Sequence, residues 1–238
     1  AMIGFNGAAN LVIDGRSGGS GNYLRFRNTH SANPVFHFRN DAEKITVRNT
    51  VIEGANSTKY VSGGITDAPG LVFFGNASSG GNGNRNILLS NNQIRDRSDA
   101  TGVPGNAIFS YNTTPSTTNN NIRILNNQIF NFSQTGVYLP DNAGNGAAWN
   151  ISGNSFYCTS NLSSYQGAVP QHIAIYLKSS VSHTDTIKHN YIGGSAANAS
   201  GTWTNSNNSV DFEGIRLEIG GTGSQITLVD SNTIKNIN

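Results

Sequence analysis

The chain is predicted to be all-β, a single-domain right-handed parallel β-helix over residues 1–238, with about seven coils and long loops. Three observations predict this fold. Gly and Asn are abundant, with 28 Gly, whereas only 12% of the residues are charged. Short apolar stretches recur along the whole length, each followed by Asn and another apolar residue. A second kind of short apolar strand recurs between these motifs.

The composition favours many tight corners over helices or disorder. Gly and Asn are poor residues for helix interiors, but they readily adopt the left-handed backbone conformations that sharp turns require. Disordered chains usually lack aromatic and β-branched residues, whereas 9% of this chain is aromatic and its Ile, Val and Leu residues cluster regularly. We therefore expect an ordered, corner-rich β-structure.

The Asn motif is the main repeat. It reads Ile-Leu-Leu-Ser-Asn-Asn-Gln-Ile in 87–94 and Ile-Arg-Ile-Leu-Asn-Asn-Gln-Ile in 122–129. The residues at the central position, at irregular intervals, are Thr50, Asn92, Asn127, Asn154, Asn190 and Asn232. Stacked in successive coils, their side chains are predicted to point inward and to form a ladder of amide hydrogen bonds while the backbone bends at the same residue.

The second strand often follows Gly or Ala, and loops absorb the irregular spacing. Its copies lie in 70–73, 107–109, 136–139, 174–177 and 214–217. Long loops rich in Ser, Thr, Asn and Gly are expected in 55–68, 75–86, 111–121, 160–171 and 194–209. Near the start, 10–15 and 23–28 are interpreted as tighter coils. Each coil thus contains at least two strands and a corner.

A column of side chains along the second strand is the candidate ligand-binding site. The outward position holds Phe109, Tyr138, Tyr176 and Arg216 in consecutive coils. Neighbouring strands lie about 4.8 Å apart, so these side chains are expected to stack into an exposed platform of the kind that holds sugar rings. The alternative is that the loops cover the rings and that they only contribute packing.

Catalysis is the main alternative function, because some enzymes, the pectate lyases among them, have parallel β-helix folds. No catalytic residues are assigned in this sequence. The best acidic group consists of Asp211, Glu213 and Glu218, with Arg216 beside them. Hydrolysis of glycosides needs two carboxylates in a defined pair, and lyases need bound Ca²⁺ or a basic residue beside the substrate acid. A cross-strand ion pair between Lys178 and Glu218 is the preferred interpretation of this region.

No cofactor, metal ion, nucleic acid or membrane is expected as a partner. The histidines show no metal-ligand spacing, and no Ca²⁺ loop motif is complete, although nearby Asp, Asn and Gly leave Ca²⁺ open. The five histidines are His30, His37, His172, His183 and His189. Cys158 is the single cysteine and is interpreted as a small buried hydrophobe. The net charge is only +2, with no run of basic residues, and no apolar stretch approaches the ~20 residues of a membrane span.

The repeats resemble the right-handed parallel β-helix repeat region of large secreted bacterial surface proteins, adhesin-like and exported by the type IX route. The similarity lies in 149–157, 190–196 and 232–237, and it spans nearly the whole chain. It implies a secreted or cell-surface location, neighbouring domains in a longer protein, and adhesion or binding of a polysaccharide or cell-surface glycan without catalysis. Two alternatives stay open, a polysaccharide lyase or glycoside hydrolase and a structural spacer.

Overall fold

The computed structural model describes residues 1–58, 68–76, 81–112, 118–140, 148–159, 171–180, 183–204, 211–221 and 223–238. These residues form three sheets of seven strands each, with one short 3-10 helix, η1 (Ala197–Ala199). The first sheet contains β1 (Ile3–Asn6), β4 (Phe36–Arg39), β7 (Val72–Phe74), β10 (Asn106–Ser110), β13 (Thr135–Leu139), β16 (Gln171–Ser179) and β19 (Asp211–Ile219).

The second sheet contains β2 (Ala9–Asp14), β5 (Glu43–Arg48), β8 (Arg85–Ser90), β11 (Asn120–Leu125), β14 (Asn150–Ser152), β17 (Thr186–Lys188) and β20 (Leu228–Asp230). The third sheet contains β3 (Leu24–Asn28), β6 (Thr50–Gly54), β9 (Gln93–Arg95), β12 (Gln128–Phe130), β15 (Ser155–Tyr157), β18 (Tyr191–Ile192) and β21 (Thr233–Ile234).

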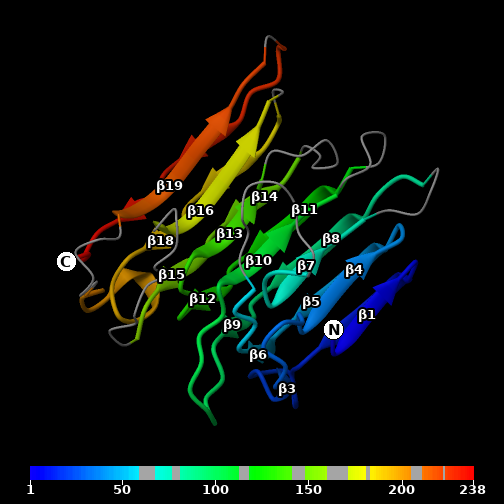
Figure 1. Cartoon of the computed structure of the whole chain (residues 1–238), viewed down its shortest axis with the longest axis horizontal. Coiled ribbons are helices and arrows are strands. Elements are labelled where there is room, and N and C mark those ends of the chain that lie inside the picture. Colours follow the sequence, from blue (N-terminus) through cyan, green and yellow to red (C-terminus); the bar gives the residue numbers. More distant parts are fainter. Residues whose placement is uncertain are drawn as a thin grey trace.

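Every third strand along the chain falls in the same sheet, and every pairing is parallel, as between β10 and β13 or β5 and β8. Three consecutive strands, one per sheet, make one coil, and the chain advances steadily from its N-terminal to its C-terminal end (Figure 1). The all-β prediction is confirmed, and the arrangement is that of a parallel β-helix. Segments 10–15 and 23–28, however, are not separate coils, because β2 and β3 belong to different sheets of one coil.

The core is built from inward-pointing columns of matching side chains. In the second sheet, Ile45, Ile87 and Ile122 lie in register and are fully buried. In the first sheet, the rings of Phe38 and Phe74 stack with their centroids 4.8 Å apart. Each such side chain contributes about 1.5–3 kcal/mol when it leaves water, so the repeated columns supply the main stabilising free energy.

The predicted Asn ladder is confirmed along its whole length. Asn92 Nδ2 donates to Asn127 Oδ1 at 3.0 Å, and the backbone N–H of Asn92 donates to the same oxygen at 2.9 Å. The same double contact joins Asn127 to Asn154, Asn154 to Asn190 and Asn190 to Asn232. Thr50 completes one end, since its hydroxyl donates to Asn92 Oδ1 at 2.9 Å.

The sharp bend falls one residue earlier than predicted. The residue preceding each ladder residue has a left-handed backbone, with φ of 54° at Asn91 and 56° at Asn126. The remaining members are Asn49, Gly153, His189 and Ser231. At Gly153 a Cβ atom would lie 2.1 Å from Asn126 Oδ1, which explains why this coil has glycine. Turning and hydrogen bonding are therefore divided between two adjacent residues.

Of the expected long loops, the described residues include most of 75–86, 111–121 and 194–209, whereas most of 55–68 and all but the end of 160–171 lie outside them. Within the described part, apolar side chains are exposed mainly in the first and last of these coils. They include Leu11, Val12 and Leu24 at one end and Leu217, Leu228, Val229 and Ile234 at the other. No helix among the described residues is long and apolar enough to span a membrane.

Candidate ligand-binding site

The four predicted binding residues do form one column on the first sheet. Phe109 pairs with Tyr138, Tyr138 with Tyr176, and Tyr176 with Arg216. The rings of Tyr138 and Tyr176 stack in parallel with centroids 4.5 Å apart, and the Arg216 guanidinium lies 5.0 Å from the Tyr176 ring centroid. The column continues beyond the prediction, because Phe73 pairs with Phe109.

The expected exposure of this column is wrong for its rings. Phe109, Tyr138 and Tyr176 are buried in a second apolar cluster, against Ile173 and Tyr111 among others. Strand alternation assigned these rings to the outward face correctly. Strand alternation gives no information about which residues pack on that face. Here other side chains cover the rings. A sugar cannot lie on them as it lies on an open aromatic platform.

The acidic group at the end of the column is neutralised by cations. Lys178 Nζ lies 3.0 Å from Glu218 Oε2, which confirms the predicted ion pair, and Arg216 Nη2 lies 2.7 Å from Glu218 Oε1. Lys178 and the hydroxyl of Tyr176 hold the pKa of Glu218 down at about 2. Glu218 is thus ionised across the physiological range and cannot serve as a general acid.

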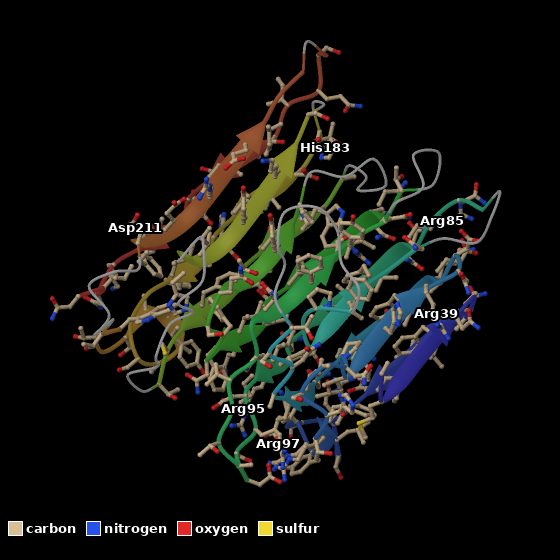
Figure 2. The ribbon with its side chains drawn as sticks, viewed as in Figure 1. Arg39, Arg85, Arg95, Arg97, His183 and Asp211 are labelled. Carbon is tan, nitrogen blue, oxygen red and sulfur yellow. The ribbon has the colours of Figure 1, made fainter. Side chains whose placement is uncertain are left out.

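Glu213 also contacts Arg216, at 3.4 Å, whereas Asp211 lies at the start of β19, beside Gln171 of the neighbouring strand. Figure 2 shows Asp211 at one end of β19. Two of the three acids, Glu213 and Glu218, therefore share Arg216 as their partner. No group of three or more metal-ligating side chains occurs among the described residues.

A depression of about 550 Å³ on the third sheet is the better candidate for a ligand site. Its lining residues are Asn22, Arg25, Val51, Asn91, Asn92, Gln93, Asn126 and Gln128. Arg25 pairs with Val51 in the adjacent strand, and Val51 with Gln93, so the outward column of β3, β6 and β9 forms its floor. We call this feature the amide groove.

Many polar atoms in the amide groove have no protein partner. Within the described ranges, no hydrogen bond is made by the side-chain amides of Asn91, Gln93 or Asn126. Asn91 and Asn126 are the left-handed corner residues, and their exposed side chains project from the corner while the next residue turns inward to the ladder. Partnerless amides in a row offer paired donors and acceptors to hydroxyl groups.

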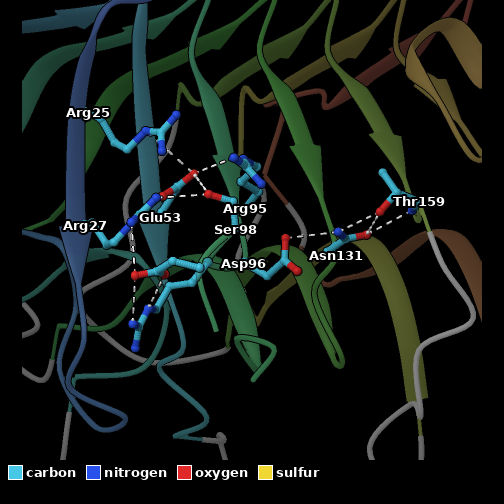
Figure 3. A network of polar contacts seen from close by, with 10 residues as sticks. Arg25, Arg27, Glu53, Arg95, Asp96, Ser98, Asn131 and Thr159 are labelled. Atoms are coloured by element: carbon cyan, nitrogen blue, oxygen red, sulfur yellow. Dashed lines mark hydrogen bonds and ion pairs between the residues drawn. The ribbon is translucent and has the colours of Figure 1, made fainter. Parts of the chain in front are cut away.

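A charged network borders the groove (Figure 3). Glu53, fully buried, contacts Arg95 and accepts a hydrogen bond from Arg27 Nε at 2.7 Å. Arg25 Nε is 3.9 Å from the same carboxylate, and the Arg25 side chain is 48% exposed. Arg27 and Arg95 are thus the close partners of Glu53, and Arg25, which lines the groove, is the more distant one.

The same network extends along the neighbouring coils. Arg27 also pairs with Asp99 at 3.0 Å. Asp96, whose pKa is raised by burial, accepts a hydrogen bond from Asn131 Nδ2 at 3.0 Å, and Asn131 Oδ1 accepts one from the Thr159 backbone at 2.9 Å (Figure 3). Arg27 thus joins the buried Glu53 to Asp99 at the surface.

The sequence contains a repeated triplet that indicates the groove, but no groove was predicted from it. The triplet Asn-Asn-Gln occurs at 91–93 and again at 126–128. Its middle residue supports the ladder, and its outer residues line the groove. Only the coil register shows that Gln93 and Gln128 lie in the same column as Arg25, with Val51 between Arg25 and Gln93.

No family model, curated protein or solved structure matches this chain.

Proposed function

We propose that the chain is a carbohydrate-binding module of a secreted bacterial surface protein, and that the amide groove holds the glycan. In this proposal the chain is one domain, a right-handed solenoid of about seven coils that continues into neighbouring domains. The observation that carries the proposal is the set of amides at Asn91, Gln93 and Asn126, which make no hydrogen bond within the described residues and line the same groove as the half-exposed side chain of Arg25. Amides bind sugar hydroxyl groups, and a guanidinium binds carboxylates in a bidentate manner.

The charge of the groove favours an acidic glycan over a neutral one. Glu53, the nearest acid, is already satisfied by Arg27 and Arg95, and Arg25 retains a weak contact at 3.9 Å. A uronate carboxylate would pair with Arg25 while its hydroxyl groups bond to Gln93 and Asn91. The predicted ring column is a second location for a ligand, but the burial of its rings makes it the weaker one.

Affinity electrophoresis through gels containing polygalacturonate, alginate or dextran tests the proposal. The unaltered chain is expected to be retarded by an acidic polymer and less by dextran. The double variant Arg25→Ala/Gln93→Ala is expected to bind about 10-fold or more weakly, since each lost charge-assisted contact costs about 1.5–3 kcal/mol. Arg123→Ala is the matched control, because Arg123 is an exposed arginine on β11 away from the groove.

Equal retardation of the double variant and the unaltered chain would place any binding elsewhere, and Tyr138→Ala then tests the ring column. No retardation by any polymer would favour the structural spacer. The continuous ladder and core columns support that second function, since they make a stiff rod without needing a ligand. Unsaturated products from an acidic polymer would instead indicate a lyase.

A further inference from the structure

A carboxylate occupies an inward column that is apolar in the preceding coils. Asp185 precedes Thr186, which pairs with Asn150, and Asn150 pairs with Arg123. This register puts Asp185 in the same column as Ile122, Ile87 and Ile45 of earlier coils. Asp185 is 1% exposed. Because burying a carboxylate costs several kcal/mol unless its oxygens are satisfied, this residue is held there by specific partners.

Both oxygens of Asp185 have a partner. Oδ1 accepts a hydrogen bond from the backbone N–H of Trp149 at 2.8 Å. Oδ2 lies 3.2 Å from His183 Nδ1, and His183 Nε2 lies 3.0 Å from the Ser179 hydroxyl. His183 is 6% exposed and Ser179 is 8% exposed. Figure 2 marks His183 at the corner that follows β16.

The direction of these hydrogen bonds follows from the chemistry of the carboxylate. An ionised Asp185 can only accept, so Nδ1 of His183 must carry the hydrogen. In a neutral imidazole Nε2 then has none, and it accepts the proton of the Ser179 hydroxyl. This order, in which an acid orients a base and the base polarises a hydroxyl, is the arrangement of an activated serine nucleophile.

The next coil fixes the backbone of all three residues. Gly220 N donates to the Ser179 carbonyl at 2.8 Å, and Leu228 N donates to that of Asp185 at 2.8 Å. The Thr227 hydroxyl donates to the His183 carbonyl at 3.1 Å. Such anchoring holds the three side chains in one geometry before any substrate arrives, which is what general-base catalysis requires.

We propose that Ser179 and His183 form a catalytic pair, positioned by Asp185, that transfers an acyl group from a carboxylic ester. Ser179 Oγ attacks the carbonyl carbon while its proton passes to His183 Nε2. The ester C–O bond breaks, and the departing alcohol oxygen takes that proton. Water then attacks the acyl-serine, giving one proton to Nε2, and the released carboxylic acid leaves as Ser179 recovers its hydrogen. The small exposure of Ser179 restricts the acyl group to a short one such as acetyl.

A fluorophosphonate probe and p-nitrophenyl acetate test this proposal, with intact-mass and peptide mass spectrometry to locate the adduct. The unaltered chain is expected to be labelled at Ser179, and Ser179→Ala to lose both labelling and ester turnover. Ser180→Ala is the matched control, since it removes the adjacent, exposed hydroxyl.

Asp185→Asn separates a catalytic role from a purely structural one. An asparagine retains an oxygen for the Trp149 N–H, but its NH₂ group faces Nδ1 and reverses the tautomer of His183. We expect this variant to fold and its labelling rate to fall by about 100-fold or more, as it does when a general base is lost. Absence of an adduct on Ser179 in the unaltered chain, with a reference serine hydrolase labelled in parallel, would overturn the proposal. Equal labelling rates for Asp185→Asn and the unaltered chain would also overturn it.

Discussion

At the residue scale, His172 makes the stability of the chain depend on pH. Its ring is fully buried, with edge contacts to Phe132, Trp203 and Phe212 at centroid distances of 5.2, 4.8 and 6.1 Å. Nε2 lies 2.7 Å from the Phe132 carbonyl oxygen, to which a neutral imidazole donates. Burial lowers the pKa of His172 to about 4, because the charged form loses its hydration.

The sign of the effect follows from the two pKa values. Above the ordinary pKa of 6.5, both the folded and the unfolded chain carry a neutral His172. Between 6.5 and about 4 only the unfolded chain binds the proton, so the free energy of unfolding falls as the pH drops, by about 3 kcal/mol in total. Urea unfolding of the unaltered chain between pH 7 and 4 should show this loss.

The variant His172→Gln should remove the part of the slope that His172 causes, and the exposed His30→Gln serves as the surface-histidine control. A smaller slope remains in His172→Gln, because the pKa of His37 is also lowered to about 4 by burial. A pH dependence in His172→Gln as steep as in the unaltered chain would show that other groups cause the loss.

At the element scale, the Asn ladder connects the corners of successive coils. Asn127 accepts two hydrogen bonds at Oδ1 from Asn92, and its Nδ2 donates to the Leu89 carbonyl at 3.0 Å and to Asn154 Oδ1 at 3.1 Å. Asn127→Ala leaves these groups buried without partners. We expect a loss of about 3 kcal/mol in the free energy of unfolding, measured by urea denaturation.

Two further variants make the ladder test specific. Asn127→Thr should recover part of the loss, because Thr50 shows that a hydroxyl can occupy a ladder position. Arg123→Ala, on the exposed face of the same coil, should change the free energy by less than about 0.5 kcal/mol. If Asn127→Ala were as stable as Arg123→Ala, the ladder would contribute no net stability.

The sequence was sufficient for features that repeat locally and insufficient for features made by distant contacts. Each ladder Asn lies in a recognisable motif, and the Lys178–Glu218 pair follows from strand alternation and coil register. The burial of Tyr138 depends on neighbours outside its strand. The groove and the Glu53 network join residues of four coils, and only the exact register places Arg25 and Gln93 in one column, on either side of Val51.

At the scale of the whole molecule, the first and last coils carry apolar residues at the same inward position of the stack. Ile13 and Val229 occupy the first and last positions of one inward column, which runs through Val47, Leu89, Ile124, Ile151 and Ile187. Val229 is 43% exposed. A second copy stacked head to tail in register would cover Val229 with Ile13 and would pair β20 with β2.

We therefore expect concentration-dependent, end-to-end association, measured by sedimentation velocity. Val229→Lys should weaken it, because the charge would be buried between the two copies. Leu228→Lys is the matched control, since Leu228 lies on the same strand with 49% exposure but points outward, in the column of Thr186 and Asn150. If both variants associate alike, the ends do not stack in register. A monomer at every concentration would mean that apolar exposure at the ends is too small to offset the entropy lost on association.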